Sequence, residues 1–203
     1  MSWAARAALL PLILLSTTPA RAEFPAAFSA WVGPGIGSGH REEVRESGPF
    51  SVLGAEAAWR FAPGRALVAV YEGAGGPIGV SYIPESPHLD RLEHFAITLG
   101  PEFSSPRKSA VAFFCRGSIG AGRVTTAGFR GMQIYTDPTV PGFEPLTEAG
   151  FAWSGAAGLW LVPRPGPVGL AIAIHAAGTS ARHSSCQSMG ATLGIALCPL
   201  DRP

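Results

Sequence analysis

The sequence is short of the residues that mark several large protein classes. It contains a single lysine, Lys108, and charged residues make up 14% of its 203 positions, against about 25% in ordinary soluble domains. The three cysteines show no C-x-x-C or metal-ligand spacing, and they are too few for a disulfide scaffold. We therefore expect no nucleic-acid partner, no metal site and no cofactor.

Long apolar runs are also missing beyond the first 22 residues. Gly, Pro or polar residues interrupt each run well before the ~18 residues that indicate a membrane-spanning helix. Glycine is abundant instead, with 26 residues, about 13% of the chain against a usual ~7%. A membrane-spanning sheet fits this mixture, because its strands need only ~9–11 residues of alternating polarity.

The first residues have the three parts of a secretory signal peptide. Arg6 gives a positive start, residues 7–15 (AALLPLILL) form a short apolar run, and Ala20-Arg21-Ala22 is an A-x-A cleavage site. We expect residues 1–22 to be removed and residues 23–203 to form one exported domain. That domain has 13 basic and 14 acidic residues once Arg6 and Arg21 are subtracted from the chain totals, so its net charge is about −1.

Alternating polarity predicts eight β-strands in the exported part. In the clearest case Val168, Leu170, Ile172 and Ile174 alternate with small residues and His175, a period of two that a helix does not produce. The predicted strands cover residues 28–39, 54–61, 66–74, 92–103, 110–122, 150–162, 168–178 and 188–197. Val68 and Val70 share a face with Glu72, which leaves the sidedness of the third strand open.

The predicted connections alternate in length. Residues 62–65, 104–109 and 164–167 are Pro-, Gly- or Ser-rich turns of hairpin length. Residues 40–53, 75–91 and 123–149 are expected to be long polar loops, and residues 179–187 a shorter one. The mixed-charge run at 41–46 is assigned to one of the long loops. An even number of strands with short turns at one end and long loops at the other is typical of bacterial outer-membrane barrels.

The two faces of the strands differ in size and polarity. We expect the bulky apolar set to face lipid; it comprises Phe95, Ile97, Leu99, Phe113, Ile119, Val168, Leu170, Ile172, Ile174, Leu193 and Ile195. The opposite face carries small residues, and its charged members are expected to form a network in the barrel interior; they are Glu56, Arg60, Glu72, His94, Glu102, Arg116 and His175. Eight strands enclose only enough space for side chains, so the interior should be filled.

The pattern resembles the small eight-stranded outer-membrane β-barrel family, the group that contains OmpA- and OmpX-like domains. The resemblance rests on the strand pattern over residues 23–203, on the Gly-rich stretches WVGPGIGSG (31–39) and GSIGAGRVT (117–125), and on ATLGIAL (191–197) as a closing strand. It implies an all-β, closed, antiparallel up-and-down transmembrane barrel in the bacterial outer membrane. The implied partners are outer-membrane lipids, the barrel-assembly machinery and an extracellular ligand at the loops, and the implied role is structural or adhesive.

Two other functions remain open at this point. A soluble exported lipocalin-like barrel would bind a small apolar ligand, but it needs the bulky face inside. A lipid A-modifying barrel enzyme would need a nucleophilic serine near a histidine, and ARHSSCQS (181–188) offers His183 beside Ser184 and Ser185. Adjacent His and Ser occur often by chance, so we expect no catalysis. We also expect no Cys186–Cys198 disulfide, because a strand would separate the two cysteines.

Overall fold

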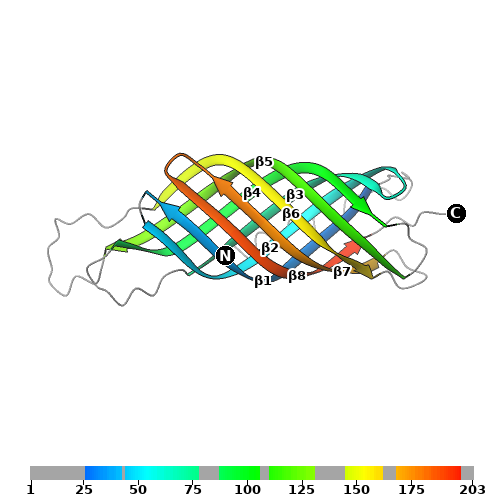
Figure 1. The fold of residues 1–203 in the computed structure, drawn as a ribbon, viewed down its shortest axis with the longest axis horizontal. Coiled ribbons are helices and arrows are strands. Elements are labelled where there is room, and N and C mark those ends of the chain that lie inside the picture. The colour runs from blue at the N-terminus through cyan, green and yellow to red at the C-terminus, as the bar shows by residue number, and fades with distance from the viewer. Residues whose placement is uncertain are drawn as a thin grey trace.

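The computed structural model describes residues 26–42, 44–77, 87–105, 110–130, 145–161 and 168–197, and these form a closed antiparallel barrel with strand order β1 to β8 (Figure 1). The strands are β1 (Ala26–Arg41), β2 (Val44–Ala62), β3 (Arg65–Pro77), β4 (Pro87–Ser104), β5 (Val111–Arg130), β6 (Leu146–Leu161), β7 (Val168–Ser180) and β8 (Ser184–Leu197). The described residues contain no helix that is long and apolar enough to cross a membrane. The predicted fold class is confirmed. The predicted signal peptide lies outside the described residues.

The strand register fixes the geometry of the barrel. Following hydrogen-bonded partners from Ala30 once around all eight strands returns to β1 at His40, ten residues farther along (40 − 30). With strands about 4.8 Å apart and a rise of about 3.3 Å per residue, this stagger tilts the strands by about 40° from the barrel axis. The tilt is the one expected of a small barrel whose interior is just wide enough for packed side chains.

The connections differ from the sequence prediction at one end of the barrel. The predicted long loop at 40–53 is wrong, because β1 and β2 continue to a tight hairpin in which Arg41 pairs with Val44. Strand β8 likewise begins at Ser184, so only residues 181–183 separate it from β7. We call this end the hairpin end. The opposite, short-turn end carries the Pro63–Gly64 turn, the start of β1 and the end of β8.

The strands also extend into the other two predicted loops. Strand β3 runs to Pro77 and β5 to Arg130, and residues 78–86 and 131–144 lie outside the description. These segments were predicted as loops because they contain polar and charged residues. A strand that projects beyond a bilayer has water on its outer face and can carry polar residues at positions of both parities, so polarity does not mark where it ends.

Large apolar side chains cover the outside of the barrel. The exposed members are Phe28, Val32, Ile36, Trp59, Phe61, Leu67, Ile97, Leu99, Phe103, Val111, Phe113, Ile119, Phe151, Val168, Leu170, Ile172, Ile174, Met189, Leu193 and Ile195. On β1 the exposed apolar residues span residues 28–36. Their cross-strand neighbours on β8 lie within residues 189–197. Along the tilted strands this is a band about 20 Å high, close to the ~25 Å apolar band of membrane barrels.

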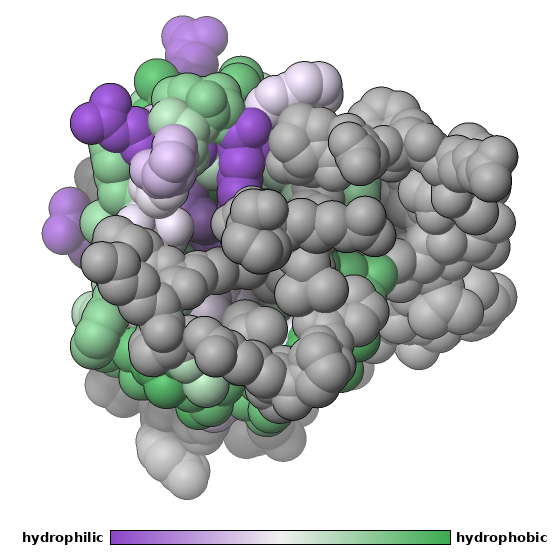
Figure 2. All heavy atoms as spheres, turned by 90° about the vertical axis from the view of Figure 1, so that its right-hand side faces the viewer, coloured by the Kyte–Doolittle hydropathy of each residue, from purple (hydrophilic) through white to green (hydrophobic). Residues whose placement is uncertain are grey.

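The hairpin edge of this band is polar. On the hairpin side of Ile36 and Met189, the outward residues become Ser38 and Gln187. Figure 2 looks along the barrel from the short-turn end, where hydrophobic residues line the lower edge of the coloured surface and hydrophilic residues gather at the upper left. On the hairpin side the exterior therefore changes from apolar to polar, as the surface of a membrane barrel does at the edge of the bilayer.

Candidate functional site

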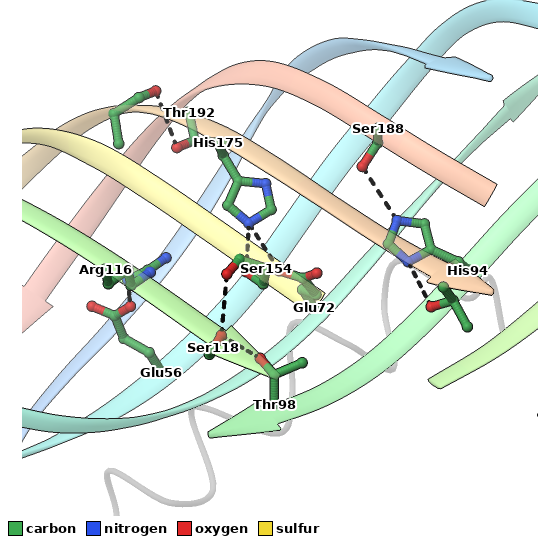
Figure 3. Close-up of polar contacts among 12 residues, drawn as sticks. Glu56, Glu72, His94, Thr98, Arg116, Ser118, Ser154, His175, Ser188 and Thr192 are labelled. Carbon is green, nitrogen blue, oxygen red and sulfur yellow. Dashed lines mark hydrogen bonds and ion pairs between the residues drawn. The ribbon is translucent and has the colours of Figure 1, made fainter. Parts of the chain in front are cut away.

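The interior of the barrel holds the buried ionisable residues. The polar group nearest the short-turn end is an ion pair. The guanidinium of Arg116 on β5 pairs with the carboxylate of Glu56 on β2, across the barrel interior (Figure 3). Both side chains are at most 5% exposed. The guanidinium also lies over the indole of Trp31, with its carbon 4.7 Å from the ring centroid. A buried charge needs such partners, because an isolated one would be very costly.

A second polar group lies nearer the middle of the barrel and centres on Glu72 of β3. Its Oε2 accepts a hydrogen bond from the Ser154 hydroxyl at 2.8 Å and lies 2.8 Å from Nε2 of His175 (Figure 3). Ser118 on β5 shares a 2.7 Å hydrogen bond with Thr98 on β4 and reaches the Ser154 carbonyl at 3.5 Å. Five strands thus contribute to one interior layer, which ties distant parts of the sequence together.

The third polar group contains the second buried histidine. Nε2 of His94 on β4 lies 3.2 Å from the Ser188 hydroxyl on β8, and Nδ1 lies 3.5 Å from the Thr179 hydroxyl on β7 (Figure 3). His94 is 1% exposed. Neutral hydroxyl partners on both ring nitrogens suit a neutral imidazole, which can donate at one nitrogen and accept at the other.

The structure therefore places the predicted interior residues on the inward face, but in separate groups. Glu56, Glu72, Glu102, His94 and His175 are all buried. Glu102 lies opposite Arg116 in the β4–β5 register, and Arg60 is half-buried at the short-turn end of β2. The described contacts pair Glu56 with Arg116 and Glu72 with His175, while His94 is held by hydroxyl groups.

The predicted lipid-facing residues lie on the other side of the wall. Ten of the eleven are among the exposed large hydrophobic residues; they are Ile97, Leu99, Phe113, Ile119, Val168, Leu170, Ile172, Ile174, Leu193 and Ile195. Phe95 also points outward and is half-buried, with the guanidinium of Arg123 5.8 Å from its ring centroid. Val68 and Val70, whose face was left open, are buried inside with Glu72.

Apolar clusters, which the alternation of the strands does not predict, cap the polar groups at both ends. Phe50, Leu89, Leu92, Val124 and Cys186 belong to one buried cluster on the hairpin side. Phe114 and Trp160 form the centre of another on the short-turn side, with ring centroids 4.9 Å apart. The described interior is therefore a packed core with a polar middle layer.

Glycines on facing strands were the signal that could have revealed these clusters. A Cβ added to Gly37 would lie 2.2 Å from the ring of Phe50, and one added to Gly39 would lie 2.3 Å from Leu92. A Cβ on Gly54 would lie 2.4 Å from the indole of Trp31. The glycines of the WVGPGIGSG stretch therefore leave room for Phe50 and Leu92, and Gly54 on β2 leaves room for Trp31.

Two serine–histidine arrangements in the structure can be compared with a catalytic relay. Ser154 Oγ lies 3.3 Å from Nε2 of His175, and Glu72 contacts the same nitrogen. In a relay the base contacts the nucleophile through one ring nitrogen and the orienting carboxylate through the other, so this buried trio does not have that geometry. No group of three metal-ligating side chains occurs among the described residues.

The second arrangement is the predicted His183–Ser184 pair, which the structure connects to a carboxylate at the hairpin end. The backbone N–H of His183 and the hydroxyl of Ser184 donate to Oε2 of Glu148, at 3.1 and 2.6 Å. The hydrogen bond from Ser184 lowers the pKa of Glu148, which lies beyond the apolar band, and the N–H of His183 adds to this effect. The serine hydroxyl is thus used to hold the β7–β8 turn.

The two hairpins at this end are joined to each other. The backbone N–H of Glu42, which has a positive φ of 55°, donates to the carbonyl of His183 at 2.9 Å. The hydroxyl of Ser185 and Nδ1 of His40 lie 2.7 Å apart on the outer face of the same strands. These contacts connect the charged β1–β2 tip to the β7–β8 turn and give the hairpin end a defined shape.

Comparison with known proteins agrees with this fold. No family model matches the chain, and no curated protein matches it. Among solved structures, the chain is similar to the Neisserial surface protein A, with a TM-score of 0.54 and 11% identity over 85% of this chain and 99% of the other. It also matches Ail, the attachment invasion locus protein of Yersinia pestis, with a TM-score of 0.44 and 12% identity over 84% of this chain and 98% of the other. The fold is that of a small closed barrel like the one in the Neisserial protein.

Proposed function

We propose that this chain is an outer-membrane protein that crosses the bilayer as an eight-stranded barrel with a filled interior. The observation that carries the proposal is the exterior band, in which twenty large apolar side chains of the described residues are exposed around a closed sheet. In water such a surface would cause aggregation, whereas in a bilayer it is the stable arrangement. A closed sheet also leaves no unpaired strand edge in the hydrocarbon.

The same observation disfavours a soluble lipocalin-like barrel. A binder of that kind keeps its large apolar residues inside, around a ligand cavity. Here Ile172, Leu193 and Phe113 point outward, while the interior middle layer contains Glu72 and His175. The proposed partners of the exterior are membrane lipids, and folding into the membrane is expected to need the barrel-assembly machinery.

Membrane fractionation combined with gel migration tests the proposal. We expect the protein in the outer-membrane fraction, and we expect its band to shift when the sample is boiled, because a folded barrel resists the detergent at room temperature. A single band that does not shift, from protein in the soluble fraction, would refute the proposal.

The proposed role is structural or adhesive, through the hairpin end. Two connections at this end, residues 78–86 and 131–144, provide chain that can contact molecules outside the cell. An epitope inserted within 131–144 should be reached by antibody on intact cells, whereas the same epitope within 162–167, at the opposite end, should be reached only after permeabilisation. The reverse pattern, or equal access to both, would refute this orientation.

A further inference from the structure

We propose that the barrel wall holds one membrane lipid in a groove on its outer face, at the hairpin side of the apolar band. This inference rests on the proposed membrane location. The groove has a volume of about 390 Å³ and crosses five adjacent strands, from β2 through β1, β8 and β7 to β6. Its outward-pointing lining residues are Ile36, Ser38, Ser47, Trp153, Ala176, Gln187 and Met189.

The strand register arranges these side chains in two rows. Ser47, Ser38, Gln187, Gly178 and Trp153 are successive cross-strand partners and form the upper row, nearer the hairpin end. The lower row lies nearer the short-turn end on each strand, separated from the upper row by one inward-pointing residue. Its successive partners are Ile36, Met189, Ala176 and Gly155. The upper row is polar but uncharged, and the lower row is apolar.

Small residues make the floor of the groove. Gly37 and Gly48 line the groove without a side chain, and Ala176, the cross-strand partner of Met189, has only a methyl group. A Cβ added to Gly178 would lie 2.9 Å from the indole nitrogen of Trp153, so the indole leans over this glycine and forms a wall. Larger side chains on both sides therefore border a depression in the wall.

The position of the groove determines the chemistry of its occupant. On β1 and β8 the boundary between the two rows is the edge of the apolar band, where Ile36 and Met189 give way to Ser38 and Gln187. On β6 the groove reaches into the band, since the exposed Phe151 lies on the hairpin side of Trp153. In a bilayer the molecules at this level are lipids, and their ester, amide or hydroxyl linkages lie between the headgroup and the acyl chain. The serine hydroxyls and the Gln187 amide can hydrogen-bond such neutral linkages.

The acyl chain has a continuous path below the groove. From Met189 the outward residues of β8 continue to Leu193 and Ile195, and on β1 they continue from Ile36 to Val32, all exposed. An acyl chain that follows the seam between β1 and β8 keeps apolar contact over its length, while its linkage stays at the polar row. The groove thus distinguishes one bound lipid from the surrounding lipids, which contact a convex wall.

The test fills the floor of the groove and counts retained lipid. Wild-type protein, Ala176→Phe and Ala69→Phe are reconstituted in phosphatidylethanolamine vesicles, extracted into mild detergent and weighed by native mass spectrometry. Ala69 is an exposed, outward alanine on β3, away from the groove, and is the matched control. We expect one retained lipid in wild type and Ala69→Phe. In Ala176→Phe the phenyl ring should displace about two methylene groups of the acyl chain from the groove, which should lower the affinity for the lipid about fifteen-fold.

A second variant keeps the test decisive if Ala176→Phe does not fold. Ser38→Ala combined with Gln187→Ala removes hydrogen bonds without adding volume, and it should lower lipid retention while leaving the heat-dependent gel shift intact. Equal retention by all variants, or equal loss in Ala69→Phe and Ala176→Phe, would overturn the inference. In either case a protein that still fractionates with the membrane and shifts on boiling leaves the proposed function standing.

Discussion

Replacing Arg116 tests how much the interior ion pair contributes to the free energy of unfolding. Arg116→Met keeps most of the side-chain volume but removes the charge that pairs with Glu56, whose side chain is 2% exposed. Breaking a buried pair by removing one partner costs about 3–5 kcal/mol, because it leaves an uncompensated buried charge. We therefore expect Arg116→Met to lose about that much of its free energy of unfolding.

The partner substitutions should follow a definite order. Glu56→Gln leaves Arg116 with Glu102 opposite it in the β4–β5 register, so this variant should lose less than Arg116→Met. The double variant Glu56→Leu with Arg116→Met leaves no charge of the pair, and apolar replacement of a buried pair is often neutral or stabilising by about 1–4 kcal/mol. The double variant should therefore recover part of the stability lost in Arg116→Met, because the buried Glu102 still lies opposite position 116.

Urea unfolding of the refolded protein in lipid vesicles measures these differences, with the heat-dependent gel shift as the probe of folding. Tryptophan fluorescence is a poor probe here, since Trp31 lies against Arg116 and would respond to the substitution itself. The slope of the unfolding free energy against urea should be unchanged, so that a shifted midpoint reports stability. Wild-type stability in Arg116→Met, or a further loss on adding Glu56→Leu, would refute the reasoning.

Three more predictions concern the wall and the hairpin end. Gly37→Ala places a methyl group against the ring of Phe50 and should lose about 1–3 kcal/mol in the same urea assay, whereas Gly117→Ala, which meets open space, should change little; equal effects would contradict the packing. Ile174→Arg puts a charge in the apolar band and should lose about 2–4 kcal/mol, while Ser180→Arg on the same strand, beyond the band, should lose about 0–1 kcal/mol. Because the pKa of Glu148 is lowered in the folded state, its contribution is present above its unfolded value, about 4.3, and is lost as pH falls through the lower folded value. The hydrogen-exchange protection factors at residues 181–183 should therefore fall at low pH in wild type, whereas in Glu148→Gln they should stay the same.

The alternation of the strands was enough to predict the fold class and the number of strands. A period of two assigns every residue of a strand to a face once one member is placed, so Phe113 and Arg116 on β5 predict opposite sides of the wall. The structure puts them there. What alternation does not encode is where a strand stops, and β1 and β2 accordingly run to Arg41 and Val44 through residues that look like a loop.

The interior groups were predictable in membership but not in pairing. Glu72 and His175 are 103 positions apart, and their contact depends on which strands face each other across the barrel. That depends on the stagger of the closed sheet, which single strands do not reveal. Gly37 and Phe50 are predictable only as a pair for the same reason: each is unremarkable on its strand, and the fit appears when the register is known.

Inside and outside therefore select the register in different ways. A slip of one residue between two strands would move every apolar side chain of one strand into the interior, and the bilayer rejects it. A slip of two residues keeps all faces correct, and lipid cannot distinguish it from the native register. The interior can, because such a slip separates Arg116 from Glu56 and moves Phe50 away from the space beside Gly37. The polar layer and the glycine-matched clusters are consequently the features that distinguish this stagger from its neighbours, which explains why a barrel whose described interior is packed keeps buried charges at all.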